Sequence, residues 1–169
     1  NQLVERLWSP WRLGYVTGAV AASTGACIFC AARDDATATS LIVSMAETCF
    51  VVLNRYPYNN GHLMVVPNRH IAALAEASHE ELAELMAVTR RAEIALAEAY
   101  SPDGMNLGIN LGRPAGAGVP GHLHLHLVPR WEGDTNFMTV VGETRVLPEE
   151  PTQTLKRLSP IFDRLARDE

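Results

Sequence analysis

Hydrophobic and polar residues alternate most strictly between Gly121 and Arg130, where a leucine follows a histidine three times in succession. A period of two residues is typical of a β-strand, because successive side chains point to opposite faces of it. The pattern therefore predicts a strand with His122, His124 and His126 on one face, roughly 6.6 Å apart, and leucines on the other. A packed core explains the leucines. It does not explain a row of imidazoles, because each buried ring nitrogen needs a partner.

Two further apolar runs, residues 49–54 and 62–67, are rich in β-branched residues and are separated by a turn of Pro, Asn and Gly. This arrangement predicts a β-hairpin. Residues 105–111 predict another strand, which leads through a glycine-rich loop into the histidine segment.

A helix is predicted to begin after Ser78, because Glu81 follows it at the spacing of a capping box. Pro102-Asp103-Gly104 is expected to end this helix. Residues at helical spacing form its expected core face: Leu82, Leu85, Met86, Thr89, Ala92 and Leu96. A final amphipathic helix is predicted over residues 151–168, and Pro160 is expected to kink or divide it.

These elements predict an α+β fold in which an antiparallel sheet carries its helices on one face. The 169 residues suffice for one domain with a real core and are too few for two. We divide the chain into an N-terminal arm at residues 1–22, a main domain at 23–147 and a C-terminal helical extension at 148–169.

The composition, with 47% hydrophobic and 20% charged residues, is that of an ordinary globular protein. A net charge of −5 argues against nucleic acid as the main partner, because binding nucleic acid depends on neutralising phosphates. No apolar run is long enough to span a bilayer and no signal-peptide pattern is present, so we expect a cytoplasmic protein with no membrane partner. Three cysteines are an odd number, which makes a disulfide framework improbable.

Two uses suit a row of three imidazoles: they can converge on a zinc ion, or one can act as a nucleophile with a neighbour assisting. The preceding segment, residues 110–118, is rich in glycine, and backbone amides in such a loop can hold phosphate oxygens. Histidines beside a phosphate-binding loop indicate phosphorus chemistry on a nucleotide.

Cys27 and Cys30 are separated by two residues, a spacing that serves both metal sites and redox pairs. A structural zinc site needs two further ligands, for which His70 and His122 are the candidates. The alternative is a pair of ordinary reduced cysteines. Cys49 lies in an apolar run and is expected to be part of the core.

The sequence His-Leu-His-Leu-His-Leu-Val at residues 122–128 resembles the motif of the histidine triad (HIT) superfamily. Residues 54–67 resemble the first hairpin of that family, and the resemblance extends from Cys27 to Arg130. The segment 7–15, with two tryptophans around a Ser-Pro turn, resembles the start of the bacterial branch that contains diadenosine tetraphosphate phosphorylases. The resemblance implies a HIT-like fold and a homodimer whose sheets join into one. Whether dimers pair into tetramers stays open.

The resemblance also implies the chemistry. His124 is expected to attack the α-phosphorus and form a covalent nucleotidyl-imidazole, with His126 orienting or protonating the leaving group. His122 is expected to hold zinc or to complete a hydrogen-bond chain, and His62 to support the triad. In related proteins the set Cys27, Cys30, His70 and His122 holds zinc, so the zinc expected here is structural and the chemistry requires no catalytic metal.

The nucleotide is expected to be an adenine nucleotide or a dinucleoside polyphosphate. The resemblance assigns a ribose hydroxyl to Asn54, whose alternative role is to cap the turn. Trp131 is expected either to stack on a base or to cover the core. Charge on the phosphate oxygens is expected to be stabilised by Asn110 and by the backbone amides of Gly116, Ala117 and Gly118.

Many hydrolases of the family carry glutamine or serine four residues before the first triad histidine, where this chain has Gly118. The smaller residue leaves room for inorganic phosphate. Together with the N-terminal arm and the segment Arg-Trp-Glu-Gly-Asp-Thr-Asn-Phe at residues 130–137, it favours phosphorolysis of diadenosine tetraphosphate over hydrolysis. The alternatives are a hydrolase of dinucleoside polyphosphates or nucleoside phosphoramidates and, in a different class, a zinc-stabilised nucleotide-binding or adaptor protein.

Overall fold

The fold is described from a computed structural model, which describes residues 27–34, 41–134 and 149–168. The predicted N-terminal arm, residues 1–22, lies outside these residues.

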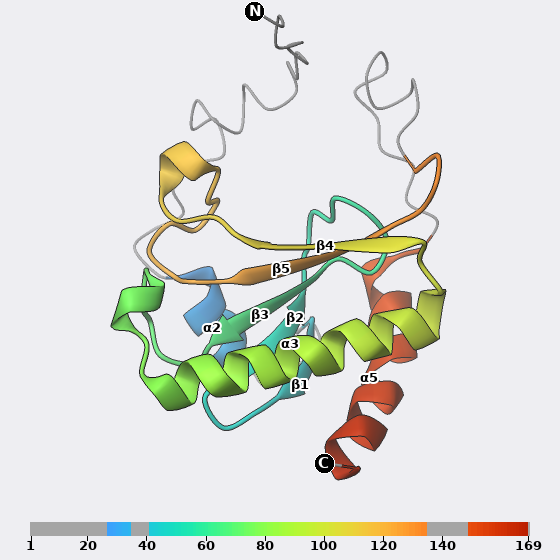
Figure 1. Ribbon diagram of the computed structural model, residues 1–169, viewed down its shortest axis with the longest axis horizontal. Helices are drawn as coiled ribbons and strands as arrows, with labels where there is room; N and C mark the ends of the chain where they lie inside the picture. The colour runs from blue at the N-terminus through green and yellow to red at the C-terminus, as the bar shows by residue number, and fades with distance from the viewer. Residues whose placement is uncertain (1–26, 35–40, 135–148, 169) are drawn as a thin grey trace, which may run out of the picture. The chain divides into compact units, whose positions relative to one another are not determined.

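The described strands form one antiparallel sheet in the order β1-β2-β3-β5-β4 (Figure 1). The predicted hairpin is confirmed, since β2 and β3 pair from Cys49 opposite Pro67 to Leu53 opposite Leu63. The strands are β1 (Ile42–Met45), β2 (Cys49–Leu53), β3 (Leu63–Pro67), β4 (Gly104–Ile109) and β5 (Leu125–Arg130). Two short 3-10 turns, η1 (Leu74–Glu76) and η2 (Arg113–Ala115), lie in the connections.

The long helix α3 (His79–Tyr100) begins with the predicted capping box. The Ser78 hydroxyl accepts a hydrogen bond from the Glu81 amide at 3.2 Å, and the Ser78 amide donates to the Glu81 carboxylate at 2.7 Å. The buried face of the helix contains Leu85, Val88, Thr89, Ala92, Ala95 and Leu96. The prediction for Met86 was wrong, because this side chain is 56% exposed: the sheet contacts a stripe centred on Leu85, Val88 and Ala92, and Met86 lies outside it.

The C-terminal helix α5 (Pro151–Arg167) contacts β1 and α3. Pro160 lies inside this helix without dividing it. Leu158 and Phe162, one on each side of the proline, are both fully buried in the same core cluster, and this packing holds the two halves together.

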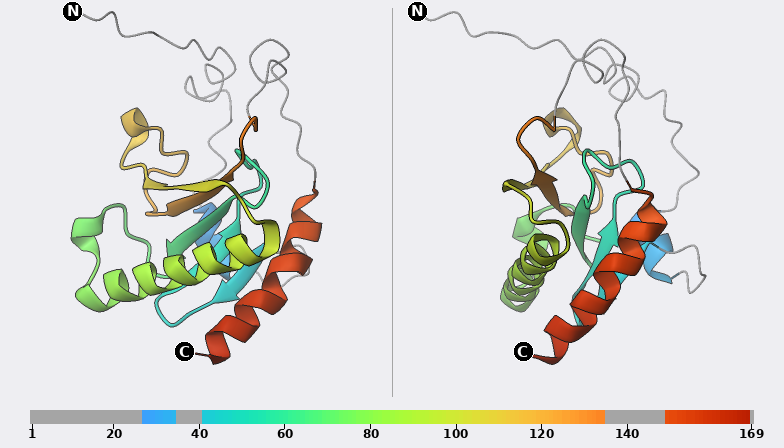
Figure 2. Two further views of the ribbon diagram at one scale, coloured as in Figure 1. Left: turned by 45° about the vertical axis from the view of Figure 1, so that its right-hand side comes forward. Right: turned by 90° about the vertical axis from the view of Figure 1, so that its right-hand side faces the viewer.

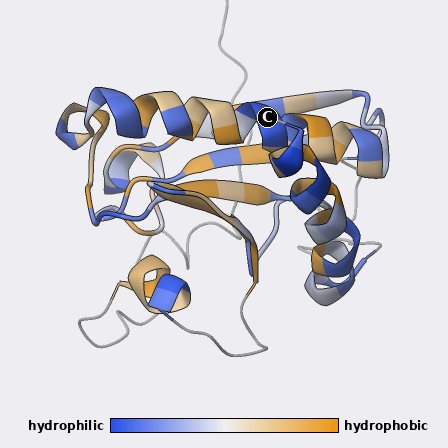
Figure 3. Cartoon of the chain, turned by 90° about the horizontal axis from the view of Figure 1, so that it is seen from below, coloured by the Kyte–Doolittle hydropathy of each residue, from blue (hydrophilic) through white to orange (hydrophobic). Residues whose placement is uncertain are grey.

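Helices lie on both faces of the sheet (Figure 2). Helices α3 and α5 cover the face that presents Val51, Leu53, Leu63 and Val65, as the sequence predicted. The prediction that all helices share one face was wrong for the short helix α2 (Ile28–Asp34), which lies on the opposite side of the sheet from α3 (Figure 3). The side chain of Phe29 packs there against Phe50, Val52, Met64 and Val66, which alternate with the residues of the first face.

The histidine segment is only partly a strand. Strand β5 begins at Leu125, so His122 and His124 precede it, although a strand was predicted from His122 onward. Continued pairing with β3 would place Leu123 opposite Pro67, which has no amide hydrogen to donate. The Leu123 amide instead donates to the Ile71 carbonyl at 2.6 Å, and the segment follows the loop after β3. None of the described helices is long and apolar enough to cross a membrane.

Candidate active site and metal centre

His124 is held in one tautomer. Its side chain is 4% exposed, and its Nδ1 lies 2.7 Å from the main-chain carbonyl oxygen of His122. A carbonyl oxygen only accepts hydrogen bonds, so Nδ1 carries the proton and Nε2 keeps a free lone pair. Burial lowers the pKa of His124, which favours the neutral ring. The ring therefore has the form that a nitrogen nucleophile requires.

His126 is held in the opposite tautomer by His62. The Tyr58 amide donates to His62 Nδ1 at 3.1 Å, so the proton of the buried His62 ring is on Nε2. His62 Nε2 lies 2.9 Å from His126 Nδ1 and donates to it. Neutral His126 then carries its own proton on Nε2. Burial, with a contribution from the neighbouring His124, lowers the pKa of His126 to about 4.

Aromatic rings surround the histidines. Phe29 of α2 is 4% exposed, and its ring centroid lies 5.0 Å from that of His124 and 5.5 Å from that of His122. The Tyr58 ring stacks on His62 at 4.9 Å with an interplanar angle of 21°. The rings of His124 and His126 meet edge to face at 4.8 Å. Sequence reasoning assigned no role to Phe29 or Tyr58; the only signal for Phe29 was its place between two candidate metal ligands.

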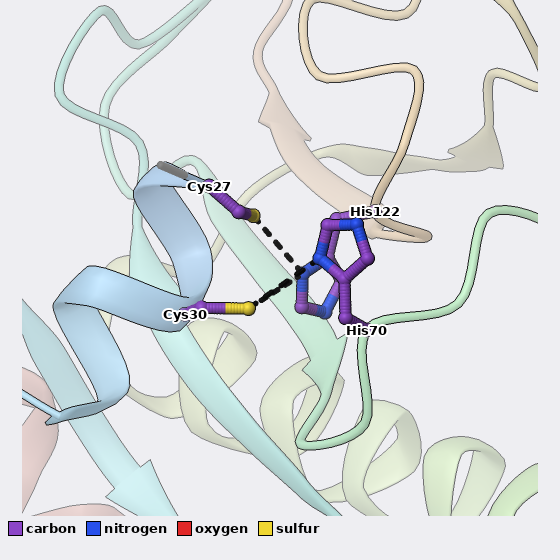
Figure 4. Close-up of side chains that lie close together, drawn as sticks. All are labelled: Cys27, Cys30, His70 and His122. Atoms are coloured by element: carbon purple, nitrogen blue, oxygen red, sulfur yellow. Dashed lines mark hydrogen bonds between the residues drawn. The ribbon is translucent and has the colours of Figure 1, made fainter. Parts of the chain in front are cut away.

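Four candidate metal ligands converge from three segments (Figure 4). Donor atoms of Cys27, Cys30, His70 and His122 all lie within 4.8 Å of one another. His122 Nδ1 lies 3.2 Å from Cys27 Sγ and 3.6 Å from Cys30 Sγ, and His70 Nδ1 lies 3.4 Å from Cys30 Sγ. A tetrahedral zinc with ordinary Zn–S and Zn–N bonds places sulfur and nitrogen about 3.6 Å apart, which these distances match.

The tautomer of His122 also suits a metal. Its Nε2 lies 2.9 Å from the Pro67 carbonyl oxygen and must donate to it, so Nδ1 has the lone pair and points at the two cysteines. Two thiolates and two imidazoles are a usual donor set for structural zinc, and all four positions of a tetrahedron are supplied by the protein. The residues present therefore fit the metal that the sequence predicted.

The glycine-rich loop differs from its prediction. The Gly116 amide donates to the Arg113 carbonyl at 2.9 Å, and the Ala117 amide donates to the Gly112 carbonyl at 3.2 Å. Both amides therefore serve the turn at η2 and are engaged within the loop. Of the three predicted amides, Gly118 alone has no hydrogen-bond partner among the described residues.

Three further predicted nucleotide-binding residues, Asn54, Asn110 and Trp131, each directly follow a strand. The Asn54 side-chain oxygen accepts from the Tyr56 amide at 2.9 Å, so Asn54 caps the turn, while its contact with ribose stays a prediction. Asn110 is half-buried and directly follows β4, and its contact with a phosphate oxygen stays a prediction. Trp131 is half-buried, and its stacking on a base also stays a prediction.

Two neighbouring histidines fixed in opposite tautomers, on an antiparallel sheet and next to a Cys/His cluster that could hold a metal, define the class as a protein with a histidine-based site. The chain belongs to the HIT family, because the model of the HIT domain matches residues 36–133.

Known relatives extend the match. The chain is 38% identical over 162 residues to a protein of Mycobacterium tuberculosis named AP-4-A phosphorylase, which covers 92% of this chain and 83% of that protein. It is 33% identical over 82 residues to the asymmetrical bis(5'-nucleosyl)-tetraphosphatase of Schizosaccharomyces pombe, covering 48% of this chain and 44% of that protein. The crystal structure of a Zn-bound histidine triad family protein from Mycobacterium smegmatis superposes with a TM-score of 0.68 at 29% identity, covering 85% of this chain and 98% of that one.

Proposed function

We propose that this protein is a diadenosine tetraphosphate phosphorylase that acts through a covalent nucleotidyl intermediate on His124. The observation that carries the proposal is the hydrogen bond from His124 Nδ1 to the His122 carbonyl, which leaves Nε2 as a free lone pair. The M. tuberculosis relative named AP-4-A phosphorylase supports the choice of reaction.

In the first step the Nε2 lone pair of His124 attacks the α-phosphorus, the P–N bond forms and the bond to the bridging oxygen breaks. The leaving group, ATP, takes the electron pair. The imidazole then carries a positive charge, and the His122 carbonyl stabilises it through the Nδ1 proton. In the second step an oxygen of inorganic phosphate attacks the same phosphorus, the P–N bond breaks and ADP forms. The electron pair returns to Nε2, so the cycle needs no proton transfer from His124.

His126 assists as a neutral hydrogen-bond donor. With a pKa of about 4 its ring carries no charge at neutral pH, and its Nε2 proton is available to the bridging oxygen of the leaving group. This role refines the expectation that His126 protonates the leaving group. An outgoing ATP is a stable anion, so a hydrogen bond is sufficient to stabilise the charge that develops on the bridging oxygen.

The identity of the acceptor depends on the space next to Gly118. This residue is exposed, has no side chain and offers an amide that the loop itself does not use. An inorganic phosphate ion fits such a position better than it fits beside a glutamine or serine side chain. Hydrolysis is the second candidate, favoured by the S. pombe tetraphosphatase relative.

A product assay with diadenosine tetraphosphate separates the candidates. ADP and ATP that appear only when inorganic phosphate is present would establish the phosphorylase. AMP and ATP at a rate indifferent to phosphate would establish the hydrolase. Tight nucleotide binding with no turnover under either condition would favour the binding or adaptor protein. Gly118→Gln serves as a matched variant, because it should suppress phosphate dependence without touching the histidines.

We further propose that zinc binds to Cys27, Cys30, His70 and His122, and that it has a structural role. When bound, the ion would fix α2, the loop after β3 and the segment before β5 relative to one another. The homodimer and the cytoplasmic location also stay proposals, the first drawn from the family resemblance and the second from the sequence.

A further inference from the structure

The contact between His62 and His126 depends on how the hairpin turn is placed against β5. Strands β3 and β5 pair only over Leu63–Val65 and Leu125–Leu127. His62 lies just beyond the last pair, in the turn that joins β2 to β3. The β3–β5 ladder therefore does not extend to His62, whose Nε2 lies 2.9 Å from His126 Nδ1. The His62 carbonyl accepts from the Asn54 amide at 3.0 Å, which joins this end of the turn to β2 but not to β5.

Asn59 replaces the missing ladder with side-chain hydrogen bonds. Its Nδ2 donates to the Pro129 carbonyl at 3.1 Å and to Asp134 Oδ2 at 2.8 Å, so the turn is joined to the end of β5. Its Oδ1 accepts from the Asn60 amide at 3.1 Å, and its carbonyl accepts from the His62 amide at 3.3 Å. Asn59 thus joins the turn to the end of β5 through its side chain and contacts the backbone of His62 through its carbonyl.

Asp134 holds Asn59 in turn. Its carboxylate, 9% exposed, accepts from Asn59, from the Trp131 amide at 3.1 Å, and from Arg130 through Nε at 2.7 Å and Nη2 at 2.8 Å. Two parallel charge-assisted bonds to one guanidinium fix the orientation of a carboxylate. Arg130 is held from the other side by the Asn106 side-chain oxygen of β4 at 2.8 Å.

We propose that Asn59 and Asp134 are positioning residues, and that their contact keeps His62 on His126 and so keeps His126 in its Nε2-protonated tautomer. This inference rests on the proposed function for its catalytic consequence. It also gives a physical role to the segment Arg130-Trp131-Glu132-Gly133-Asp134, which the sequence pointed to without a mechanism. The carboxylate of Asp134 touches no reacting atom and acts through Asn59 and the turn.

The test is Asn59→Ala, with Asp134→Asn as a milder variant that keeps an acceptor oxygen. In the unliganded protein, ¹⁵N-histidine NMR reads which nitrogen of His126 carries the proton. We expect a protonated Nε2 and an unprotonated Nδ1 in the parent, and a mixture of both tautomers in each variant. Turnover should fall roughly 10- to 100-fold in kcat for Asn59→Ala, with KM changed by less than about twofold, because a small misplacement affects chemistry more than binding.

Asn106→Ala is the matched control. Asn106 contacts the same Arg130–Asp134 pair, but from β4 and away from His62. If the cluster served stability alone, Asn59→Ala and Asn106→Ala would lower the melting temperature and kcat alike and leave the His126 tautomer unchanged, which would overturn the proposal. The double variant Asn59→Ala/Asp134→Asn should lose no more kcat than the more damaging single variant, because both residues act through one contact.

The NMR readout needs no turnover, so failure of the phosphorylase proposal would leave this test intact. If Asn59→Ala does not fold, Asp134→Asn carries the decision by the same spectrum. An unchanged His126 tautomer in a folded Asp134→Asn protein would then overturn the proposal.

Discussion

The main-chain carbonyl of His122 accepts the Nδ1 proton of His124 at 2.7 Å, while the His122 ring directs its own Nδ1 at Cys27 Sγ, 3.2 Å away. One residue therefore belongs to the candidate metal centre through its ring and to the candidate nucleophile through its backbone. Movement of the His122 ring on loss of a metal would shift the carbonyl that fixes the tautomer of His124.

Cys30→Ser should lose zinc. Changing an outer-shell partner of a metal site already costs about 10- to 100-fold in affinity, so loss of a direct ligand should cost more. Elemental analysis of the purified protein should give one zinc per chain in the parent and much less than one in the variant. Cys49→Ala is the control, because Cys49 is a buried core cysteine outside the cluster, and burial raises its pKa to about 12. Full zinc content in Cys30→Ser would contradict the assignment.

His124→Ala should abolish turnover and retain nucleotide binding. Without this imidazole the proposed covalent intermediate cannot form, so kcat should fall on the order of 10⁴-fold. Calorimetric titration with a non-cleavable nucleotide analogue should give an affinity close to that of the parent. Retention of substantial turnover by the variant would show that His124 forms no covalent intermediate.

Phe29→Leu should reduce kcat by roughly tenfold, because the Phe29 ring contacts His124 and His122. Displacing a catalytic group by about 1 Å can reduce the rate by up to ~100-fold. The matched control is Phe162→Leu, a fully buried phenylalanine of α5 in the other core cluster. Both changes should cost roughly 1–2 kcal/mol of unfolding free energy. Equal kcat losses in the two variants would show that Phe29 acts only through stability.

Lowering the pH should destabilise the protein over a pH range that the pKa of His126 determines. Its pKa is about 4 in the folded protein and 6.5 as the ordinary value, so between these pH values the unfolded chain binds more protons than the folded one. Stability should then fall as the pH is lowered from about 6.5 to about 4, and burial of His122 and His124 acts in the same direction. Thermal unfolding measured across this range should show a melting temperature that falls less steeply with decreasing pH in His126→Gln than in His79→Gln, a control change at an exposed residue.

Local pattern was enough to predict much of the scaffold. The hairpin of β2 and β3, the capping box at Ser78 and the end of α3 before Pro102 follow from residues close together in the chain. The four metal-ligand candidates were also correct as a group that meets in space, and the family was identified from its motif. The predictions that failed concern packing: the exposure of Met86, the face occupied by α2 and the residue at which β5 begins.

The sequence by itself determined which residues are available for chemistry, because period-two alternation and short-range turn signals depend on covalent geometry within a few residues. The tertiary structure decided which nitrogen of the His122 and His126 rings carries a proton. The partner that fixes His122 is the Pro67 carbonyl, 55 residues away, and the partner that fixes His126 is His62, 64 residues away. A neutral imidazole has two tautomers of similar energy, so only a donor or acceptor brought close by folding can select one. That selection distinguishes the proposed nucleophile, His124, from the proposed hydrogen-bond donor, His126.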